Sequence, residues 1–256
     1  MTAKEKLALG KLVLCMGLRQ ARTVDVAMIA AQAGFDCVYV DMEHSPISLE
    51  TTSLICAGCH GLGITPLVRP PSHGADWISR TLDGGAHGLI VPHVSNAAQA
   101  RAIVAAARFP PLGSRSVMGP TPALGYKAMP LGETNRTLNA QTLLIVMIET
   151  PEGVERADEI AAIDGIDMLL IGSNDLCTEL GIPGELRHPK LRAAYEAVAR
   201  GCKKHGKSLG VGGIRGDAEL QKQLVELGAR FIIAGNDVSY LAGAARADVQ
   251  ALRKLA

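Results

Sequence analysis

Four short apolar stretches of the chain lead directly into polar residues whose types suit metal binding and proton transfer. If the stretches are parallel strands of one barrel, their carboxyl ends meet at one rim, where the active sites of such barrels lie. Any one of these residues could instead cap a helix, so it is their convergence that favours a site. They are Asp41, Glu43 and His44 after the second stretch, Arg69 after the third, Glu149 after the fifth, and Gly172, Ser173, Asn174 and Asp175 after the sixth.

Glu149 and Asp175 follow neighbouring expected strands, so their carboxylates are predicted to point toward a common position. Such oxygen ligands with open positions suit Mg²⁺ or Mn²⁺, with Co²⁺ as a further candidate. Water and a chelating α-keto acid would complete the coordination, and the cation would stabilise charge developing on the keto oxygen. Arg69 suits the same oxygen or a substrate carboxylate, and its alternative role is a salt bridge to a neighbouring acid.

His44 is the predicted general base, because it directly follows a strand within a polar cluster. Asp83, which ends the helical stretch ISRTLD, would orient this imidazole and raise its basicity if the fold brings the two together. His93, in IVPHV after the fourth stretch, is the competing histidine of the rim. A Schiff-base mechanism is disfavoured, since none of the expected strands carries a lysine.

The pentapeptide C-A-G-C-H at 56–60 matches the attachment motif of c-type haem. It lies inside SLETTSLICAGCHGLG, a stretch with helical character. Haem attachment favours a short, loop-rich and exported chain, and the context here differs on each count. A chance match is therefore the prediction.

Apolar and amphipathic stretches alternate along the chain, which is typical of βα units around a parallel sheet. Eight units in 256 residues favour a closed (β/α)8 TIM barrel, as a single domain over 1–256, rather than an open doubly wound sheet. No G-x-G-x-x-G follows the first stretch, so dinucleotide binding has little support. The expected strands are 12–16, 37–41, 65–69, 88–91, 143–148, 168–171, 208–211 and 231–234, and the main expected helices are 24–33, 76–82, 97–108, 154–162, 190–204 and 218–227.

One long irregular segment, 109–141, contains prolines at 110, 111, 120, 122 and 130. A loop of this length in a compact domain is usually functional, and we expect it on the catalytic face before the fifth strand. Its alternative role is a surface flap or a contact between copies of the chain.

Charge is nearly balanced, with 26 basic and 25 acidic residues, and no basic run suggests a nucleic-acid or membrane surface. The expected partner is therefore a small molecule. No stretch reaches the ~18 apolar residues of a membrane span, and the N-terminus does not read as a signal peptide. The 6 cysteines lie in apolar stretches and imply no disulfide framework, so we expect a cytoplasmic protein.

Five motifs occur in order along nearly the whole chain: VDMEHSP at 40–46, LVRP at 67–70, LDGGAHGLIVPHV at 82–94, VMIETPEGV at 146–154 and DMLLIGSNDL at 167–176. Together they resemble the HpcH/HpaI family of metal-dependent (class II) pyruvate aldolases, such as 4-hydroxy-2-oxoheptanedioate and 2-keto-3-deoxy sugar acid aldolases. The resemblance implies a phosphoenolpyruvate/pyruvate-type barrel. It also implies reversible cleavage of a 4-hydroxy-2-keto acid to pyruvate and an aldehyde through a metal-stabilised enolate.

The resemblance also implies a role for each rim residue. It places the metal ligands at Glu149 and Asp175, the base at His44, the transition-state-stabilising arginine at Arg69 and the residue that strengthens the base at Asp83. Substrate contacts are implied at Arg69, Met147, Gly172, Ser173, Asn174 and Asp175. Such proteins are typically hexamers that exchange an extra C-terminal helix, for which 237–255 is suitable.

Two positions depart from the family pattern. Met147 stands where many relatives carry glutamine, and Gly172-Ser173-Asn174-Asp175 stands where many carry G-P-x-D. The first change removes a possible hydrogen bond to the keto acid, so the natural substrate is expected to differ. The small residues of GVGGIRG at 210–216 leave room for a bulky or polar aldehyde.

Two other functions remain open at this point. An acyl-CoA thioester lyase of the citrate or malyl type would use the same carboxylate pair, but it needs a basic path for the coenzyme, and no such cluster is evident. A non-catalytic keto-acid-binding protein would keep Glu149 and Asp175 but has no need of His44 and Arg69 together.

Overall fold

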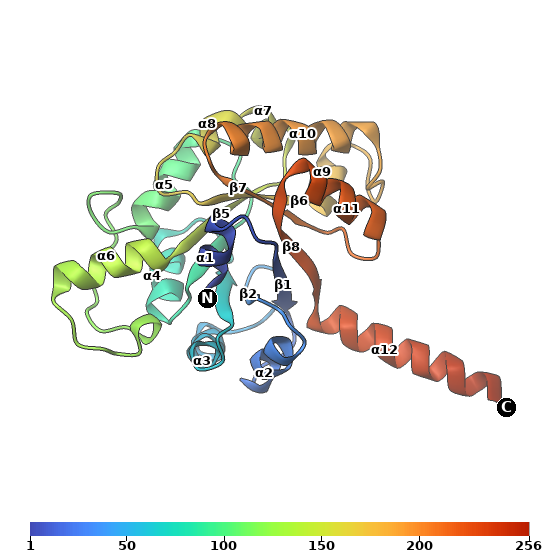
Figure 1. The fold of residues 1–256 in the computed structure, drawn as a ribbon, viewed down its shortest axis with the longest axis horizontal. Helices are drawn as coiled ribbons and strands as arrows, with labels where there is room; N and C mark the ends of the chain where they lie inside the picture. Colours follow the sequence, from blue (N-terminus) through green and yellow to red (C-terminus); the bar gives the residue numbers. More distant parts are fainter. Residues whose placement is uncertain (256) are drawn as a thin grey trace.

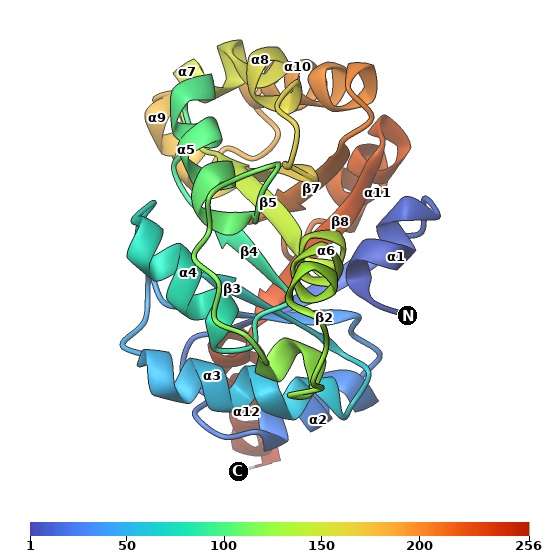
Figure 2. The ribbon, with the colours of Figure 1, turned by 90° about the vertical axis from the view of Figure 1, so that its left-hand side faces the viewer.

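The computed structural model describes residues 1–255 and places eight parallel strands in a closed barrel in the order β1 to β8. Neighbouring strands pair in sequence, and β8 returns to pair with β1, which closes the ring. Helices surround the barrel (Figures 1 and 2). The predicted (β/α)8 class is therefore confirmed. The strands are β1 Val13–Leu18, β2 Cys37–Asp41, β3 Thr65–Arg69, β4 Gly88–Val91, β5 Leu143–Ile148, β6 Met168–Gly172, β7 Ser208–Gly212 and β8 Ala229–Asn236.

The helices follow the expected alternation, with at least one between each pair of successive strands. The expected helix over 154–162 is instead two short helices on either side of Arg156. The helices are α1 Ala3–Ala8, α2 Asp25–Gln32, α3 Leu49–His60, α4 Ala75–Asp83, α5 Ala97–Ala107, α6 Leu131–Gln141, α7 Pro151–Glu155, α8 Ala157–Ala161, α9 Ser173–Glu179, α10 Pro189–Lys204, α11 Ala218–Leu227 and α12 Asp237–Leu252, with short 3-10 turns η1 Pro122–Leu124 and η2 Arg253–Leu255.

Two buried clusters explain why the strands are apolar on both faces. Alternate strand residues such as Cys37, Leu67, Ile145 and Phe231 fill the inside of the barrel, together with Leu7 of α1. The residues between them pack outward against the helices in a larger cluster. Because side chains alternate along a strand, each strand contributes to both clusters. This double burial makes the carboxyl ends of the strands the natural place for polar groups.

The CAGCH motif lies in α3, and Cys56 and Cys59 are both buried as free thiols. Burial raises the pKa of the Cys56 thiol well above its usual range and that of Cys59 to about 12. Both side chains belong to the cluster between the helices and the barrel. The prediction of a chance match agrees with this structural role as small apolar residues.

The segment 109–141 differs from its predicted form in two respects. It contains η1 and α6, so it is not irregular throughout. It also lies at the amino-terminal ends of the strands: His87, which precedes β4, contacts the Ala123 carbonyl, and Arg108 binds the carbonyl oxygens of Asn139 and Thr142 just before β5. Expecting it on the catalytic face was wrong, because a segment that leads into a strand reaches that strand's amino end.

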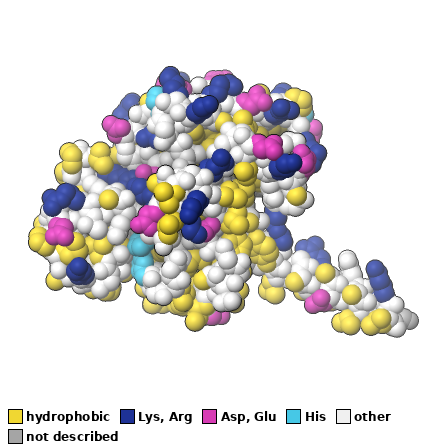
Figure 3. All heavy atoms as spheres, viewed as in Figure 1, with side chains coloured by type: hydrophobic (Ala, Val, Ile, Leu, Met, Phe, Trp, Pro, Cys, Tyr) yellow, Lys and Arg dark blue, Asp and Glu magenta, His cyan; other side chains and the backbone are white. Residues whose placement is uncertain are grey.

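The C-terminal helix α12 extends away from the barrel (Figure 1). None of its residues is buried, and Leu241 is 74% exposed. Apolar side chains are visible along the helix in Figure 3. No helix among residues 1–255 combines the length and apolar character needed to cross a membrane.

Candidate active site

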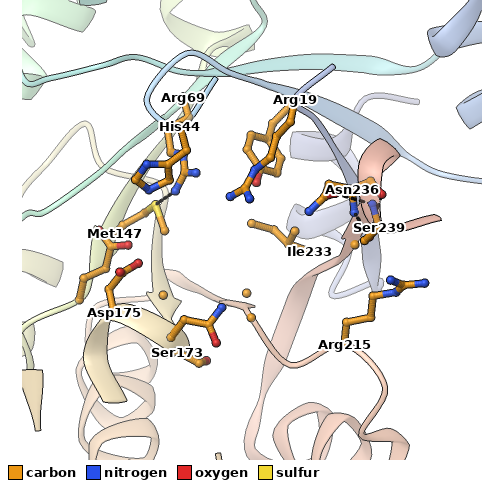
Figure 4. A pocket seen from close by; sticks show the side chains of 17 residues that line it. Arg19, His44, Arg69, Met147, Ser173, Asp175, Arg215, Ile233, Asn236 and Ser239 are labelled. Atoms are coloured by element: carbon orange, nitrogen blue, oxygen red, sulfur yellow. Dashed lines mark hydrogen bonds between the residues drawn. The ribbon is translucent and has the colours of Figure 1, made fainter. Parts of the chain in front are cut away.

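A cavity of about 440 Å³ opens at the carboxyl ends of the strands. It collects residues from seven of the eight strands or from the segments that follow them, and Figure 4 shows it from close by. The barrel therefore brings together His44, Arg69, Met147, Glu149, Gly172, Ser173, Asn174 and Asp175, which were all predicted for one rim. The cavity is also lined by Arg19, Tyr39, Gly212, Gly213, Arg215, Ile233, Gly235, Asn236 and Ser239.

Asp41, fully buried at the end of β2, organises two arginines. It accepts hydrogen bonds from Arg69 through Nε at 3.0 Å and Nη2 at 2.7 Å, and from Arg19 through Nε at 2.9 Å. Burial opposes the charge of Asp41, but the hydrogen bonds and charge of Arg69, helped by Arg19, outweigh it and lower the pKa of the carboxyl. Arg69 is thus held in one orientation. The alternative prediction, a salt bridge between Arg69 and a neighbouring acid, is also confirmed.

Glu43 connects Arg69 to the two rim histidines. One carboxylate oxygen lies 3.2 Å from Nη1 of Arg69 and 3.6 Å from Nε2 of His44, while the other lies 2.9 Å from Nε2 of His93. The His44 ring is about half exposed to the cavity, with 47% of its side-chain surface accessible, and its backbone N–H donates to Asp41. The His44 ring therefore has one carboxylate neighbour, at 3.6 Å, whereas the His93 ring has two.

Glu149 is buried at the end of β5, with 1% of its surface exposed. Its carboxylate accepts a hydrogen bond from the backbone N–H of His93 at 2.8 Å, and Nδ1 of the His93 ring lies 3.4 Å away. Burial raises the pKa of Glu149 to about 7, and the negative charge of Asp175 adds to this, although His93 acts in the opposite direction. The negative charges of the two predicted ligands, Glu149 and Asp175, therefore repel one another.

Asp175 belongs to the first turn of α9, which begins directly after Gly172. A Cβ atom on Gly172 would lie 2.5 Å from Oε1 of Glu149, so only glycine lets the two chain segments approach this closely. Ser173 is fully buried and accepts a hydrogen bond of 2.8 Å from the Tyr195 hydroxyl on α10. This contact connects the start of α9 to a helix outside the barrel.

Met147 is buried on β5, and its sulfur lies 3.9 Å from Nη1 of Arg69. It lines the cavity between Arg69 and Asp175 (Figure 4). A thioether is a weak acceptor, so this contact leaves Arg69 available to other groups. Among residues 1–255, no group of three or more His, Cys, Asp or Glu side chains is arranged to hold a metal ion alone.

Asp83 is not part of this cavity. It ends α4, and its carboxylate accepts a hydrogen bond of 2.6 Å from Arg115. A barrel helix runs antiparallel to the strands it connects, so its last residue reaches the amino-terminal face. Within residues 1–255 no hydrogen bond or ion pair joins Asp83 to His44, and the single chain does not make the predicted contact.

Several residues that line the cavity were not predicted from the sequence, and Arg19 is the most important of them. β1 was expected to end at residue 16, but it continues through Leu18, so Arg19 stands directly at a strand end. Asn236 was missed for the same reason, because β8 runs two residues past its expected end. Longer strand bounds would have placed both on the rim.

Comparison with known proteins adds a family to this geometry. The model of the HpcH/HpaI aldolase/citrate lyase family matches residues 18–244. The chain belongs to this family. A 4-hydroxy-4-methyl-2-oxoglutarate aldolase from Chaetomium globosum is 41% identical over 254 residues, which cover 98% of this chain and 94% of that protein. A 4-hydroxy-2-oxo-heptane-1,7-dioate aldolase from Escherichia coli is 34% identical over 221 residues, with 86% and 83% covered.

The fold is also that of an HpcH/HpaI protein. The crystal structure of the HpcH/HpaI aldolase from Desulfitobacterium hafniense DCB-2 matches with a TM-score of 0.95 and 32% identity, over 100% of this chain and 98% of that one. The family resemblance read from the motifs is therefore confirmed, and the description of the family names carbon–carbon lyases.

Proposed function

We propose that this protein is a class II aldolase that reversibly cleaves a 4-hydroxy-2-keto acid to pyruvate and a second carbonyl compound. The observation that carries the proposal is the placement of Glu149 and Asp175 in one cavity with Arg69 and His44. Relatives named as aldolases of 4-hydroxy-2-oxo acids support the same reaction.

The donor set suits a divalent cation. Glu149 is a buried carboxylate, and its raised pKa reflects a charge that neighbouring side chains compensate only in part. Glu149 and Asp175 would hold Mg²⁺, Mn²⁺ or Co²⁺, with the remaining positions left to water and substrate. When bound, the cation would polarise the keto oxygen of the substrate as a Lewis acid.

His44 would act as the base. It would remove the proton of the C4 hydroxyl, the C3–C4 bond would break, and the electron pair would pass toward the C2 keto group. Arg69, fixed by Asp41, would stabilise the negative charge of the resulting enolate before C3 is protonated. His93 is less suited as the base, because both of its ring nitrogens face carboxylates, Glu43 at 2.9 Å and Glu149 at 3.4 Å.

Pyruvate release from a panel of 4-hydroxy-2-keto acids, with and without EDTA, tests the reaction. We expect EDTA to abolish turnover and Mg²⁺ or Mn²⁺ to restore it. His44→Ala should lower kcat by about 10²- to 10⁴-fold while calorimetry finds Mn²⁺ affinity unchanged. His93→Ala is the matched control, since it should alter Mn²⁺ affinity more than it alters proton transfer. Cleavage of malyl-CoA in place of every keto acid would contradict the assignment.

The assembly proposed is a homo-oligomer, with a hexamer favoured by the family resemblance. The exposed apolar residues Leu241, Val249 and Leu252 of α12 support a contact with another copy of the chain. Light scattering of the full chain, compared with a Leu241→Glu and Leu252→Glu double variant, tests this: the variant should dissociate. The six free and buried cysteines support a reducing compartment such as the cytoplasm.

A further inference from the structure

The first turn of α12 forms part of the cavity wall, although the rest of this helix extends away from the barrel. Its N-cap Asn236 and its third residue Ser239 both line the cavity, on the same side as Arg19 (Figure 4). These two residues form a capping box, in which the side chain of each accepts a hydrogen bond from the backbone N–H of the other. The start of the helix is therefore fixed at the edge of the site.

Asp237, the first residue of α12, binds the loop after β1 (residues 19–24). Its carboxylate oxygens accept hydrogen bonds from three successive backbone N–H groups, those of Arg19 at 2.9 Å, Gln20 at 2.9 Å and Ala21 at 2.7 Å. Burial opposes the charge of Asp237, but its hydrogen bonds to the backbone outweigh burial and lower the pKa of the carboxyl. Hydrogen bonds to an ionised acceptor are strong, so one side chain fixes the backbone of three residues.

The loop after β1 has few other hydrogen bonds. Among residues 1–255, the backbone of residues 20–23 has one more, from the Arg22 guanidinium to the Ala21 carbonyl, and this bond stays within the loop. Segments with few stabilising contacts open at a low cost in free energy. Asp237 is therefore the main hydrogen-bonded connection between this loop and the rest of the protein.

Arg19 connects the loop after β1 to the reacting centre. Asp237 binds its backbone, and its Nε donates to Oδ2 of Asp41 at 2.9 Å. The same oxygen accepts a hydrogen bond from Nη2 of Arg69 at 2.7 Å. A shift of the Arg19 backbone would therefore remove a donor from the carboxylate that orients Arg69. Reacting groups tolerate little displacement, since an error of about 1 Å can cost about 10²-fold in rate.

Resting on the proposed aldolase reaction, we propose that Asp237 is a positioning residue that acts through Arg19. It keeps the Arg19 side chain on Asp41 and so helps to keep Arg69 aimed at the developing enolate. Asp237 does not line the cavity itself, so it takes no direct part in the reaction. The start of α12 therefore supports the chemistry at the rim of the barrel.

A double-mutant cycle tests this connection. Asp237→Ala should lower kcat for pyruvate release by about 10-fold and change KM by less than about 3-fold, because Arg69 acts on the enolate. Asp237→Asn keeps one of the two acceptor oxygens and should have an intermediate effect. Arg19→Met removes the donor to Asp41 and should resemble Asp237→Ala. Adding Asp237→Ala to Arg19→Met should then lower kcat by less than about 2-fold further, because both changes break one connection.

Asp248→Ala, at an exposed position of the same helix, is the control and should leave kcat unchanged. Losses that multiply in the double variant would mean that Asp237 and Arg19 act independently, and would overturn the inference. Circular dichroism of each variant separates these effects from loss of the fold.

Crystal structures of the wild type and of Asp237→Ala give a second measurement, which does not depend on turnover. The Arg19 guanidinium should leave Asp41 in the variant, and a guanidinium that stays on Asp41 would also overturn the inference. If the wild-type protein releases no pyruvate from any keto acid, the aldolase assignment fails. The crystal structures then decide by themselves whether Asp237 positions Arg19.

Discussion

Arg69 and Asp41 form a buried, bidentate ion pair, with Nε 3.0 Å from Oδ1 and Nη2 2.7 Å from Oδ2. Adjacent strands supply the two residues, which pair directly in the register of β2 and β3. The sheet itself therefore aims the guanidinium into the cavity. Fixed geometry of this kind is what allows an arginine to stabilise charge without reorganising during the reaction.

Asp41→Asn should show how far activity and stability each depend on the ion pair between Asp41 and Arg69. We expect kcat to fall by about 10²-fold, because Arg69 loses its fixed position. We also expect the free energy of unfolding to fall by roughly 3 kcal/mol, because a buried guanidinium loses its counter-charge. Chemical denaturation and pyruvate release measure the two effects. Asp164→Asn, at an exposed position, should change neither.

Gly172→Ala should damage the proposed metal site through a single methyl group. Its Cβ would lie 2.5 Å from Oε1 of Glu149, so either the carboxylate or the start of α9 must move. The affinity for Mn²⁺ should fall by about 10-fold or more, as calorimetry would detect. Gly61→Ala is the matched control, since a Cβ there meets nothing within 4 Å. Equal Mn²⁺ affinity in both variants would argue against Glu149 as a ligand.

Glu149→Gln should change the pH dependence of stability in metal-free protein. Burial raises the pKa of Glu149 from 4.5 to about 7 in the folded state, so the folded protein holds this proton more tightly than the unfolded chain. Its contribution to stability is therefore present below pH 4.5 and is lost as the pH rises through 7. At pH 8 in EDTA the variant should be more stable than wild type by up to about 3 kcal/mol, and this gain should vanish near pH 4. A constant difference across that range would contradict the raised pKa.

Tyr195→Phe should test the connection between α10 and the start of α9. The change leaves the buried Ser173 hydroxyl without its 2.8 Å partner and should cost about 1–3 kcal/mol of unfolding free energy. If the hydrogen bond positions α9, the KM for the keto acid should rise while kcat changes little. Tyr126→Phe, at a side chain that is 67% exposed, serves as the control. A change in stability without any change in KM would mean that the hydrogen bond of Ser173 stabilises the fold but does not position α9 for substrate binding.

The apolar strands could be predicted from sequence because burial on both faces leaves a continuous apolar signal. β2, β3, β4 and β5 have the bounds expected for them. The ends of β1 and β8 were missed because Gly17 and Gly235 follow their expected ends, and glycine is depleted in strands. Site residues after strands two, three, five and six could be found because parallel strands share one rim.

Contacts between elements distant in sequence could not be predicted in the same way. Nothing in the order of residues indicates that Asp41 accepts hydrogen bonds from both Arg19 and Arg69. Nor does it indicate that His93 lies between Glu43 and Glu149. The antiparallel course of α4 also carries Asp83 to the opposite face, although the motif alone suggested proximity to His44. Such relationships depend on the tilt and closure of the barrel.

The closed ring of strands also fixes the distance across the cavity between β1 and β5. β1 and β5 cannot move apart, because every strand between them is hydrogen-bonded to its neighbours on either side. The span from Glu149 to Arg19 is therefore set by the girth of the barrel and not by a movable loop. A molecule that contacted both of these side chains would therefore be limited in length by the barrel backbone.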